Sequence, residues 1–191
     1  MAKEEDYKRK MLVMLYNALV IPILTYNANS IAATVEDFEK LNICQRRHLR
    51  RILGLIRLDK ISNVKLYEKS RTIPISITIM TMRWQYFGKI LRMPEDSPPQ
   101  QALIFAIIGS KKLKSRRGRH QTNLYETLKK EVENNLNIKL DTENQLSIIK
   151  EKAKDVKIWN ELYDVCKKSI NVECESRNYK QKLKSHAKEV H

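Results

Sequence analysis

The sequence predicts an all-α protein in three parts: a helical bundle over residues 1–109, a basic linker over 110–121, and a C-terminal helical segment with a basic tail over 122–191. Apolar residues recur every three or four residues through most of the chain, as on one side of an amphipathic helix. Only residues 75–80 alternate as a strand would, and no second alternating run could pair with them. Hydrophobic residues make up 42% of the chain and charged residues 31%, which is typical of a globular protein.

The first element expected is a helix over residues 5–21, followed by a proline. Pro22 lacks an amide hydrogen and is expected to kink or end this helix. Residues 21–33 fit either a second helix or a turn. Farther along, Ser62 is placed to cap a short helix that runs through Tyr67. The apolar side of the first helix would be formed by Tyr7, Met11, Leu12, Leu15, Leu19 and Val20.

A second helix, expected over residues 35–53, carries an unusual row of arginines. Thr34 can cap its first turn, and Asp37 suits the positive end of the helix. Gly54 supplies a stop. Its apolar side would contain Phe38, Leu41, Leu49, Ile52 and Leu53, with Gln45 tolerated among them. At 100° per residue, the opposite side would carry Arg46, Arg47, Arg50 and Arg51.

Three further helices are expected in the middle of the chain. Residues 75–92 keep helical spacing in spite of their alternating start, and Pro94 follows as a stop, so a helix is favoured over a lone strand. Residues 100–108 form a short apolar helix, and residues 122–134 resume helical spacing after the basic linker.

A last, long helix is expected from a capping box at Thr142 to about Ser169. Trp84 and Trp159 could stack on nucleic-acid bases, but both fall on apolar helical sides, which favours a place in the core. The apolar side of this helix would comprise Leu146, Ile149, Ala153, Val156, Trp159 and Tyr163.

Positive charge is the main functional signal in the sequence. Lysine and arginine number 37 against 22 acidic residues, a net charge of +15, and two runs without an acid hold much of this excess. A solvated charged surface is the ordinary explanation of such runs, but no glutamate stands four residues away to neutralise them. A polyanion such as nucleic acid is therefore the expected partner. The candidate binding residues are Arg46, Arg47, His48, Arg50, Arg51, Arg57, Lys111, Lys112, Lys114, Arg116, Arg117 and Arg119.

Neither a metal site nor a membrane segment is expected. Cys44, Cys166 and Cys174 form no Cys-x-x-Cys pattern, and their sparse number favours free thiols in a reducing compartment, with Cys44 in the core. The apolar segment from Met11 to Leu24 is interrupted by Tyr16, Asn17 and Pro22. The charged N-terminus does not fit a secretory signal. The protein is expected to be intracellular, nuclear or cytoplasmic, without a membrane partner.

Several segments, taken together and in order, resemble the C-terminal part of reverse transcriptases from non-LTR (LINE-like) retrotransposons. They span about residues 10–163. The resemblance implies a thumb-like helical bundle, which grips the template–primer duplex, followed by a trailing helical segment. The matching pieces are Leu15–Tyr26, Arg46–Gly54, Ile61–Asn63, Met82–Pro94, Arg116–Arg119, Ala153–Asp155 and Trp159.

No catalytic residue and no cofactor are expected, because polymerase chemistry needs clustered carboxylates for two Mg²⁺ ions. The resemblance places those carboxylates in a palm that would precede Met1, and the chain contains no Asp-Asp pair. The expected function is a non-catalytic, nucleic-acid-binding fragment that grips the template–primer or an RNA backbone. A repurposed helical subunit that binds proteins in a larger assembly, or a non-functional element remnant, are the alternatives. The sequence leaves the choice between RNA and DNA open.

Overall fold

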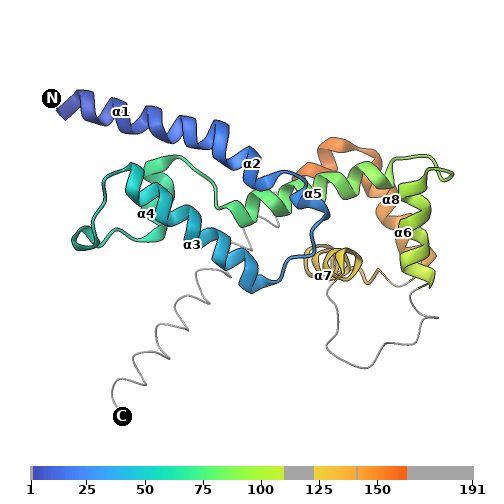
Figure 1. The fold of residues 1–191 in the computed structure, drawn as a ribbon. Coiled ribbons are helices and arrows are strands. Elements are labelled where there is room, and N and C mark those ends of the chain that lie inside the picture. The colour runs from blue at the N-terminus through green and yellow to red at the C-terminus, as the bar shows by residue number, and fades with distance from the viewer. Residues whose placement is uncertain (1, 110–122, 141, 163–191) are drawn as a thin grey trace, which may run out of the picture. The chain divides into compact units, whose positions relative to one another are not determined.

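The structure, a computed structural model, describes residues 2–109, 123–140 and 142–162, and this part of the chain contains helices and no strand (Figure 1). The predicted all-α fold is therefore confirmed. The elements are α1 (Ala2–Leu15), a π turn (Tyr16–Val20), α2 (Ile21–Thr25), a 3-10 turn (Ala28–Ser30), α3 (Val35–Ile52), a 3-10 turn (Arg57–Asp59), α4 (Asn63–Ser70), α5 (Ile75–Leu91), α6 (Pro98–Gly109), α7 (Leu124–Leu136) and α8 (Glu143–Lys154).

These elements belong to two compact units. The first draws its described residues from Met1–Tyr86 and Gly118–Thr127, and the second from Phe87–Arg117 and Leu128–His191. The predicted linker at 110–121 lies outside the described residues, so the three-part division of the chain stays a prediction.

The helix that begins the first unit does not end at Pro22. A π turn joins α1 to α2, and the amide of Ile21 donates to the carbonyl of Tyr16, five residues back. Pro22 then lies in the first turn of α2, directly after the widened turn, and its missing amide hydrogen leaves one helical bond unmade there. The widened turn is thus a local adjustment to the proline, and the helical backbone continues to Thr25.

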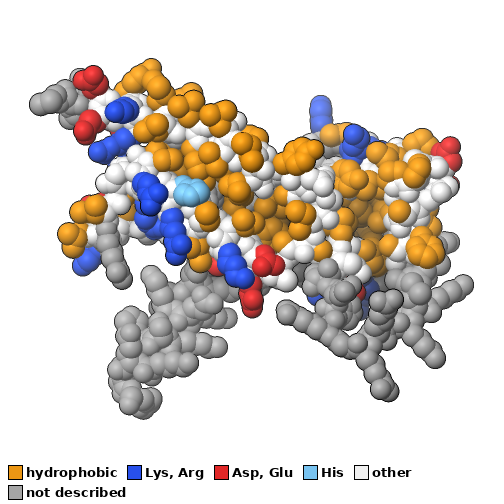
Figure 2. Space-filling model, viewed as in Figure 1, with side chains coloured by type: hydrophobic (Ala, Val, Ile, Leu, Met, Phe, Trp, Pro, Cys, Tyr) orange, Lys and Arg blue, Asp and Glu red, His pale blue; other side chains and the backbone are white. Residues whose placement is uncertain are grey.

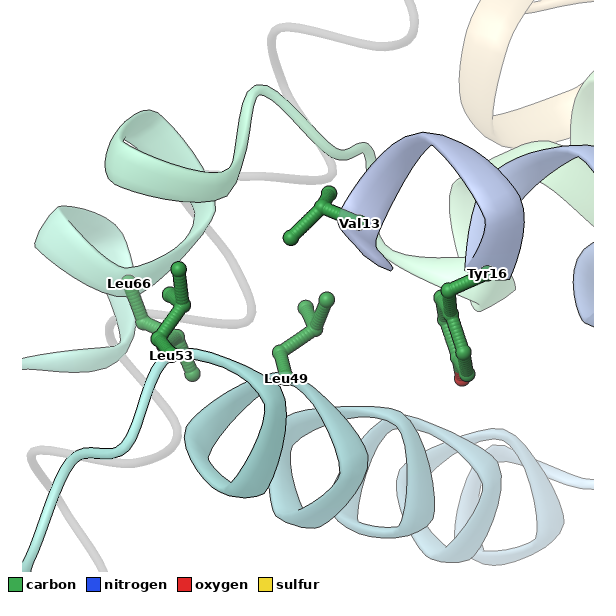
Figure 3. Close-up of a cluster of buried hydrophobic side chains, with 5 residues drawn as sticks. All are labelled: Val13, Tyr16, Leu49, Leu53 and Leu66. Atoms are coloured by element: carbon green, nitrogen blue, oxygen red, sulfur yellow. The ribbon is translucent and has the colours of Figure 1, made fainter. Parts of the chain in front are cut away.

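The buried side of α1 is not the one predicted. Val13 and Tyr16 pack with Leu49 of α3, with Leu53 directly after that helix and with Leu66 of α4, and form a core cluster of this unit (Figure 3). Val20 lies at the edge of this core, partly buried. The other residues of the predicted apolar side, Tyr7, Met11, Leu12, Leu15 and Leu19, are exposed. The correction has a simple cause: α1 is apolar on two sides, and α3 and α4 cover only one.

Helix α3 begins and ends as the sequence predicts. The Thr34 hydroxyl accepts from the amide of Asp37 at 3.3 Å, and the Asp37 carboxylate accepts from the amide of Thr34 at 3.1 Å. Leu49 is fully buried, and Gly54 follows the helix with φ of +64°, a conformation that favours glycine. The short helix α4 also begins as predicted, with the Ser62 hydroxyl accepting from the amide of Lys65.

Amide side chains of α3 cap the start of α5. Gln45 accepts from the amide of Ile75 at 2.8 Å, and Asn42 accepts from the amide of Ser76 at 3.2 Å while donating to the Ser76 hydroxyl. These bonds satisfy amides that a helix start leaves without an internal partner. Ile75, Ser76 and Ile77 are consecutive and all buried, so this turn is covered on more than one side, and its apolar residues stand closer together than on a helix with a single buried side. The choice of a helix here is confirmed.

In the second unit, Trp159 packs against α5. Its ring lies 5.9 Å from that of Phe87, and a Cβ added to Gly88 would collide with the indole. Arg92 donates to the carbonyl of Ala153 at 2.9 Å. Trp84 and Trp159 are both 1% exposed, so the prediction that both tryptophans belong to the core is confirmed.

The expected long helix from Thr142 is interrupted at Asp155. Thr142 caps α8 as predicted, but α8 ends at Lys154, and Asp155 has an extended backbone. The Asp155 carboxylate accepts from the amide of Lys157 at 2.7 Å, so it starts a new helical segment that is described to residue 162. Just beyond the interruption Val156 is half-exposed instead of buried, while Trp159 keeps its predicted buried place. Tyr163 and Ser169 lie outside the described residues.

Candidate nucleic-acid interface

The four arginines of α3 fall into two pairs with different surroundings. Because a helix turns 100° per residue, Arg46 and Arg50 lie about 40° apart, beside the buried edge of the helix. Arg47 and Arg51 form the second pair, about 100° farther round. The prediction that all four share the outer side is therefore correct for Arg47 and Arg51 only.

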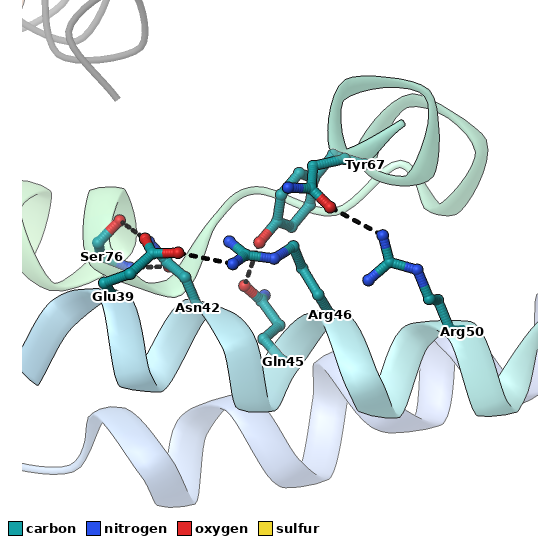
Figure 4. Close-up of polar contacts among 8 residues, drawn as sticks. Glu39, Asn42, Gln45, Arg46, Arg50, Tyr67 and Ser76 are labelled. Atoms are coloured by element: carbon teal, nitrogen blue, oxygen red, sulfur yellow. Dashed lines mark hydrogen bonds and ion pairs between the residues drawn. The ribbon is translucent and has the colours of Figure 1, made fainter. Parts of the chain in front are cut away.

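Arg46 is held by a carboxylate of its own helix. Its guanidinium donates to Glu39 at 2.6 Å, and its side chain is only 12% exposed (Figure 4). Glu39 lies seven residues earlier, two turns along α3 and on the same side. The expectation that no acid neutralises the arginine row fails here, because the acid stands at i−7 rather than at i−4.

Arg50 reaches across to the start of α4. Its guanidinium donates to the side-chain carbonyl of Asn63 at 2.8 Å, and the residue is half-buried. The partner of Arg50 is a neutral amide, so the positive charge of Arg50 is not balanced by a negative one. It therefore ties α3 to α4 while still contributing to the local positive potential.

Tyr67 of α4 packs beside both of these arginines. Its hydroxyl donates to Gln45 at 3.3 Å. Burial raises the pKa of Tyr67, and the nearby charges of Arg46 and Arg50 offset this only in part. The phenol therefore stays neutral in the ordinary pH range, and its proton remains available for the bond to Gln45.

Arg47 and Arg51 stand free of such partners. Both are exposed, one turn apart, and within the residues that the structure describes neither forms an ion pair or a hydrogen bond. Lysine and arginine side chains line the surface along α3 (Figure 2). A guanidinium has five donors in a planar fork, which suits the oxygens of a phosphate. These two residues are the part of the predicted site that the structure leaves open to a ligand.

His48 is engaged within the protein. Nδ1 lies 3.3 Å from the hydroxyl of Tyr16, and the two rings meet edge-on with centroids 5.7 Å apart. Nε2 lies 3.8 Å from the thiol of Cys44. With both ring nitrogens facing protein groups, His48 supports the packing of α1 on α3 more than it offers a donor to phosphate. Cys44 is exposed, so its predicted place in the core is wrong.

The remaining candidates are not placed by the structure. Arg57 begins the 3-10 turn Arg57–Asp59, and only its backbone is described. Six others lie outside the described residues: Lys111, Lys112, Lys114, Arg116, Arg117 and Arg119. Their role in binding stays a prediction, as does the pairing of the two basic runs.

The structure adds two partners that sequence reasoning missed. Glu39 shares the side of Arg46 two turns away, so helical spacing could have revealed it. Asn63 carries no such signal, because its approach to Arg50 depends on how α4 folds back on α3.

The described residues offer neither a metal site nor a membrane-spanning helix. Residues 2–109, 123–140 and 142–162 contain no group of three or more side chains that could hold a metal ion. None of the helices described combines the length and the apolar character needed to cross a bilayer. Comparisons of the chain with protein-family models, curated proteins and solved structures found no match.

Proposed function

We propose that this chain binds the sugar-phosphate backbone of nucleic acid through α3, as a non-catalytic, thumb-like fragment of the kind found in non-LTR reverse transcriptases. One observation carries the proposal: Arg47 and Arg51 project from one exposed side of α3, and neither has a partner within the described residues. Like charges one turn apart destabilise a helix by a few tenths of a kcal/mol. An anion bridging the two guanidinium groups removes that cost.

The surroundings of this pair favour phosphate over an acidic side chain as the ligand. Arg50 adds a positive charge next to this pair, and its neutral partner Asn63 does not balance that charge. Arg46 contributes little field, since Glu39 balances its charge. A row of exposed cations on a straight helix suits a regular line of phosphates, which carries a charge at each nucleotide.

A simpler function for Arg51 is local. It lies in the last turn of α3, where a cation offsets the negative end of the helix dipole. That role accounts for one arginine but not for Arg47, which lies a turn earlier. It also predicts a stability effect without any effect on binding, so the two functions separate experimentally.

The proposal is tested by fluorescence anisotropy with labelled RNA and DNA duplexes. Arg47→Gln with Arg51→Gln is expected to weaken binding about 10-fold or more at low salt. The matched control is Lys65→Gln with Lys69→Gln, which removes the same charge from exposed positions on α4. We expect this control to weaken binding much less, and circular dichroism checks that both variants keep their helices. Equal reductions in the two variants would contradict a specific role for α3.

The basic run from Lys111 to Arg119 belongs to the same proposal as a second backbone contact. Replacing its six cations with glutamine is expected to weaken binding further, by an amount that depends on salt. No polymerase activity is expected from the chain alone, and a primer-extension assay with Mg²⁺ tests this. Primer extension by the purified chain would contradict the non-catalytic part of the proposal.

A second candidate function, assembly with another protein chain, is favoured by a different observation. The side of α1 and α2 that faces away from α3 is apolar and exposed. The charged phosphates of a nucleic acid do not pack against an apolar surface. The two candidate functions therefore concern different parts of the molecule.

A further inference from the structure

The exposed side of α1 carries a continuous apolar stripe. Tyr7, Met11, Met14 and Ala18 follow one another at spacings of four, three and four residues, the pattern of a helix–helix seam. Tyr7 is 67% exposed and Met14 71%. Beyond the π turn, Ile23 prolongs the apolar surface at 76% exposed. Figure 2 shows hydrophobic side chains on the surface along α1 and α2.

This stripe makes α1 apolar on two sides. The other side, with Val13 and Tyr16, already packs against α3 and α4. A helix that borders solvent normally has one apolar side and one polar side. Two apolar sides are typical of a helix that is covered on both, and among the described residues α3 and α4 cover only one of them.

The exposed surface is large enough for a stable interface. The exposed apolar residues between Tyr7 and Tyr26 leave on the order of 1,000 Å² uncovered in all, although they do not all lie on one side of the helix. A standard interface buries about 800 Å² on each partner. The contributing residues are Tyr7, Met11, Leu12, Met14, Leu15, Leu19, Ile23, Leu24 and Tyr26.

The charge pattern favours a second copy of this chain as the occupant. No charged residue occurs from Met11 to Thr34, so two copies that pair there bring no like charges together. In an antiparallel pair centred near Met14, Lys8 and Lys10 of one copy lie level with Val20 and Ala18 of the other, where no like charge stands. A parallel pair would instead place the lysines of both copies together.

We propose that two copies of the chain pair through α1 and α2 as an antiparallel, two-fold symmetric helix pair. Met14 lies near the middle of the stretch from Tyr7 to Ile23, so the two-fold axis passes near it, and each Met14 meets the other. This contact is isologous, which limits assembly to a dimer. It leaves Arg47 and Arg51, on α3, outside the contact.

The dependence on salt concentration distinguishes this dimer contact from nucleic-acid binding. Two chains of net charge +15 repel each other, and salt screens that repulsion, so dimerisation is expected to strengthen as salt rises. Binding to a phosphate backbone weakens as salt rises. Failure of one proposal therefore does not imply failure of the other.

The test is sedimentation equilibrium at chain concentrations up to about 100 µM, in the absence of nucleic acid. We expect the wild-type chain to reach the mass of a dimer, and Met14→Glu to remain a monomer because two carboxylates would meet at the axis. The matched control is Leu58→Glu, since Leu58 is 82% exposed and lies in the turn after α3. This control is expected to dimerise like the wild type.

A mixing experiment tests the axis itself. Met14→Glu and Met14→Lys are each expected to be monomeric, whereas an equal mixture forms a heterodimer in which opposite charges meet. A wild-type chain that stays monomeric at all concentrations would overturn the proposal. So would a Met14→Glu dimer, or a mixture that fails to associate while both variants keep their helical circular dichroism.

Discussion

Glu39 and Arg46 form an ion pair at 2.6 Å across two turns of α3, with the arginine side chain 12% exposed and the glutamate 40% exposed. Because of this pair, the arginines of α3 differ in their surroundings. Arg46 becomes part of the packing between α3 and α4, while Arg47 and Arg51 keep their charge facing outward. The surface offered to an anion is therefore narrower than the sequence alone suggests.

The first prediction concerns this ion pair. Glu39→Gln leaves the mostly buried side chain of Arg46 without its carboxylate, and is expected to reduce stability by about 1 kcal/mol, a modest value because Glu39 is partly exposed. The freed charge is expected to tighten nucleic-acid binding a few-fold. Thermal unfolding and anisotropy measure the two effects. Glu36→Gln, at an exposed position in the first turn of α3, serves as the control and is expected to cost only a few tenths of a kcal/mol, through the loss of an acid at the positive end of the helix.

The second prediction concerns the hydrogen bonds by which Gln45 caps the start of α5. Gln45→Ala removes the acceptor for the Ile75 amide and the partner of Tyr67, and leaves a buried donor unsatisfied. A decrease of about 2 kcal/mol in the free energy of unfolding is expected. Chemical denaturation of this variant beside Gln85→Ala, at an exposed position of α5, gives the comparison. Similar decreases in both variants would show that the hydrogen bonds of Gln45 add nothing to the free energy of unfolding.

The third prediction concerns the packing of Trp159 on α5. Gly88→Ala places a methyl group against the indole, and the fit is tight enough that a shift must follow. A decrease in stability of about 1–3 kcal/mol is expected, with a change in tryptophan fluorescence as the ring becomes more exposed. Trp159→Leu combined with Gly88→Ala is expected to cost less than the two single effects added together, because the clash is then relieved. Strict additivity would contradict the contact.

The fourth prediction is a pH dependence at the start of α3. Hydrogen bonds from Thr34 lower the pKa of Asp37, and nearby Lys40 lowers it further. Because this pKa is lower in the folded chain than in the unfolded one, the stabilisation is complete above about pH 4 and is lost as pH falls through the folded pKa. Thermal unfolding of the wild type and of Thr34→Ala across the acidic range measures it. The variant is expected to show the smaller acid-induced loss of stability, and Asp37→Asn lacks this titration altogether.

The sequence predicted those features that depend on neighbours along the chain. Thr34 and Ser62 cap helices as expected, because capping is an interaction over three residues. The lone alternating segment at 75–80 was resolved correctly as a helix, since no other strand could pair with it. Periodicity and capping were sufficient for these elements.

Features that depend on contacts between distant parts of the chain could not be predicted from the sequence. The apolar residues of α1 fit two sides, and only the position of α3 and α4 decides which side is buried. Arg50 and Asn63 meet because α4 folds back on α3. The break at Asp155 was missed for another reason: apolar periodicity continued through it, while the side chain of Asp155 satisfied the backbone amides that start a new segment.

The most direct test of the proposed function is the salt dependence of duplex binding. For the wild-type chain, the logarithm of the binding constant is expected to fall linearly with the logarithm of salt concentration. In Arg47→Gln with Arg51→Gln, that slope is expected to be shallower by about 2, because each missing guanidinium leaves one phosphate with its counterions still bound. An unchanged slope in this variant, or a wild-type slope near zero, would contradict backbone recognition by α3.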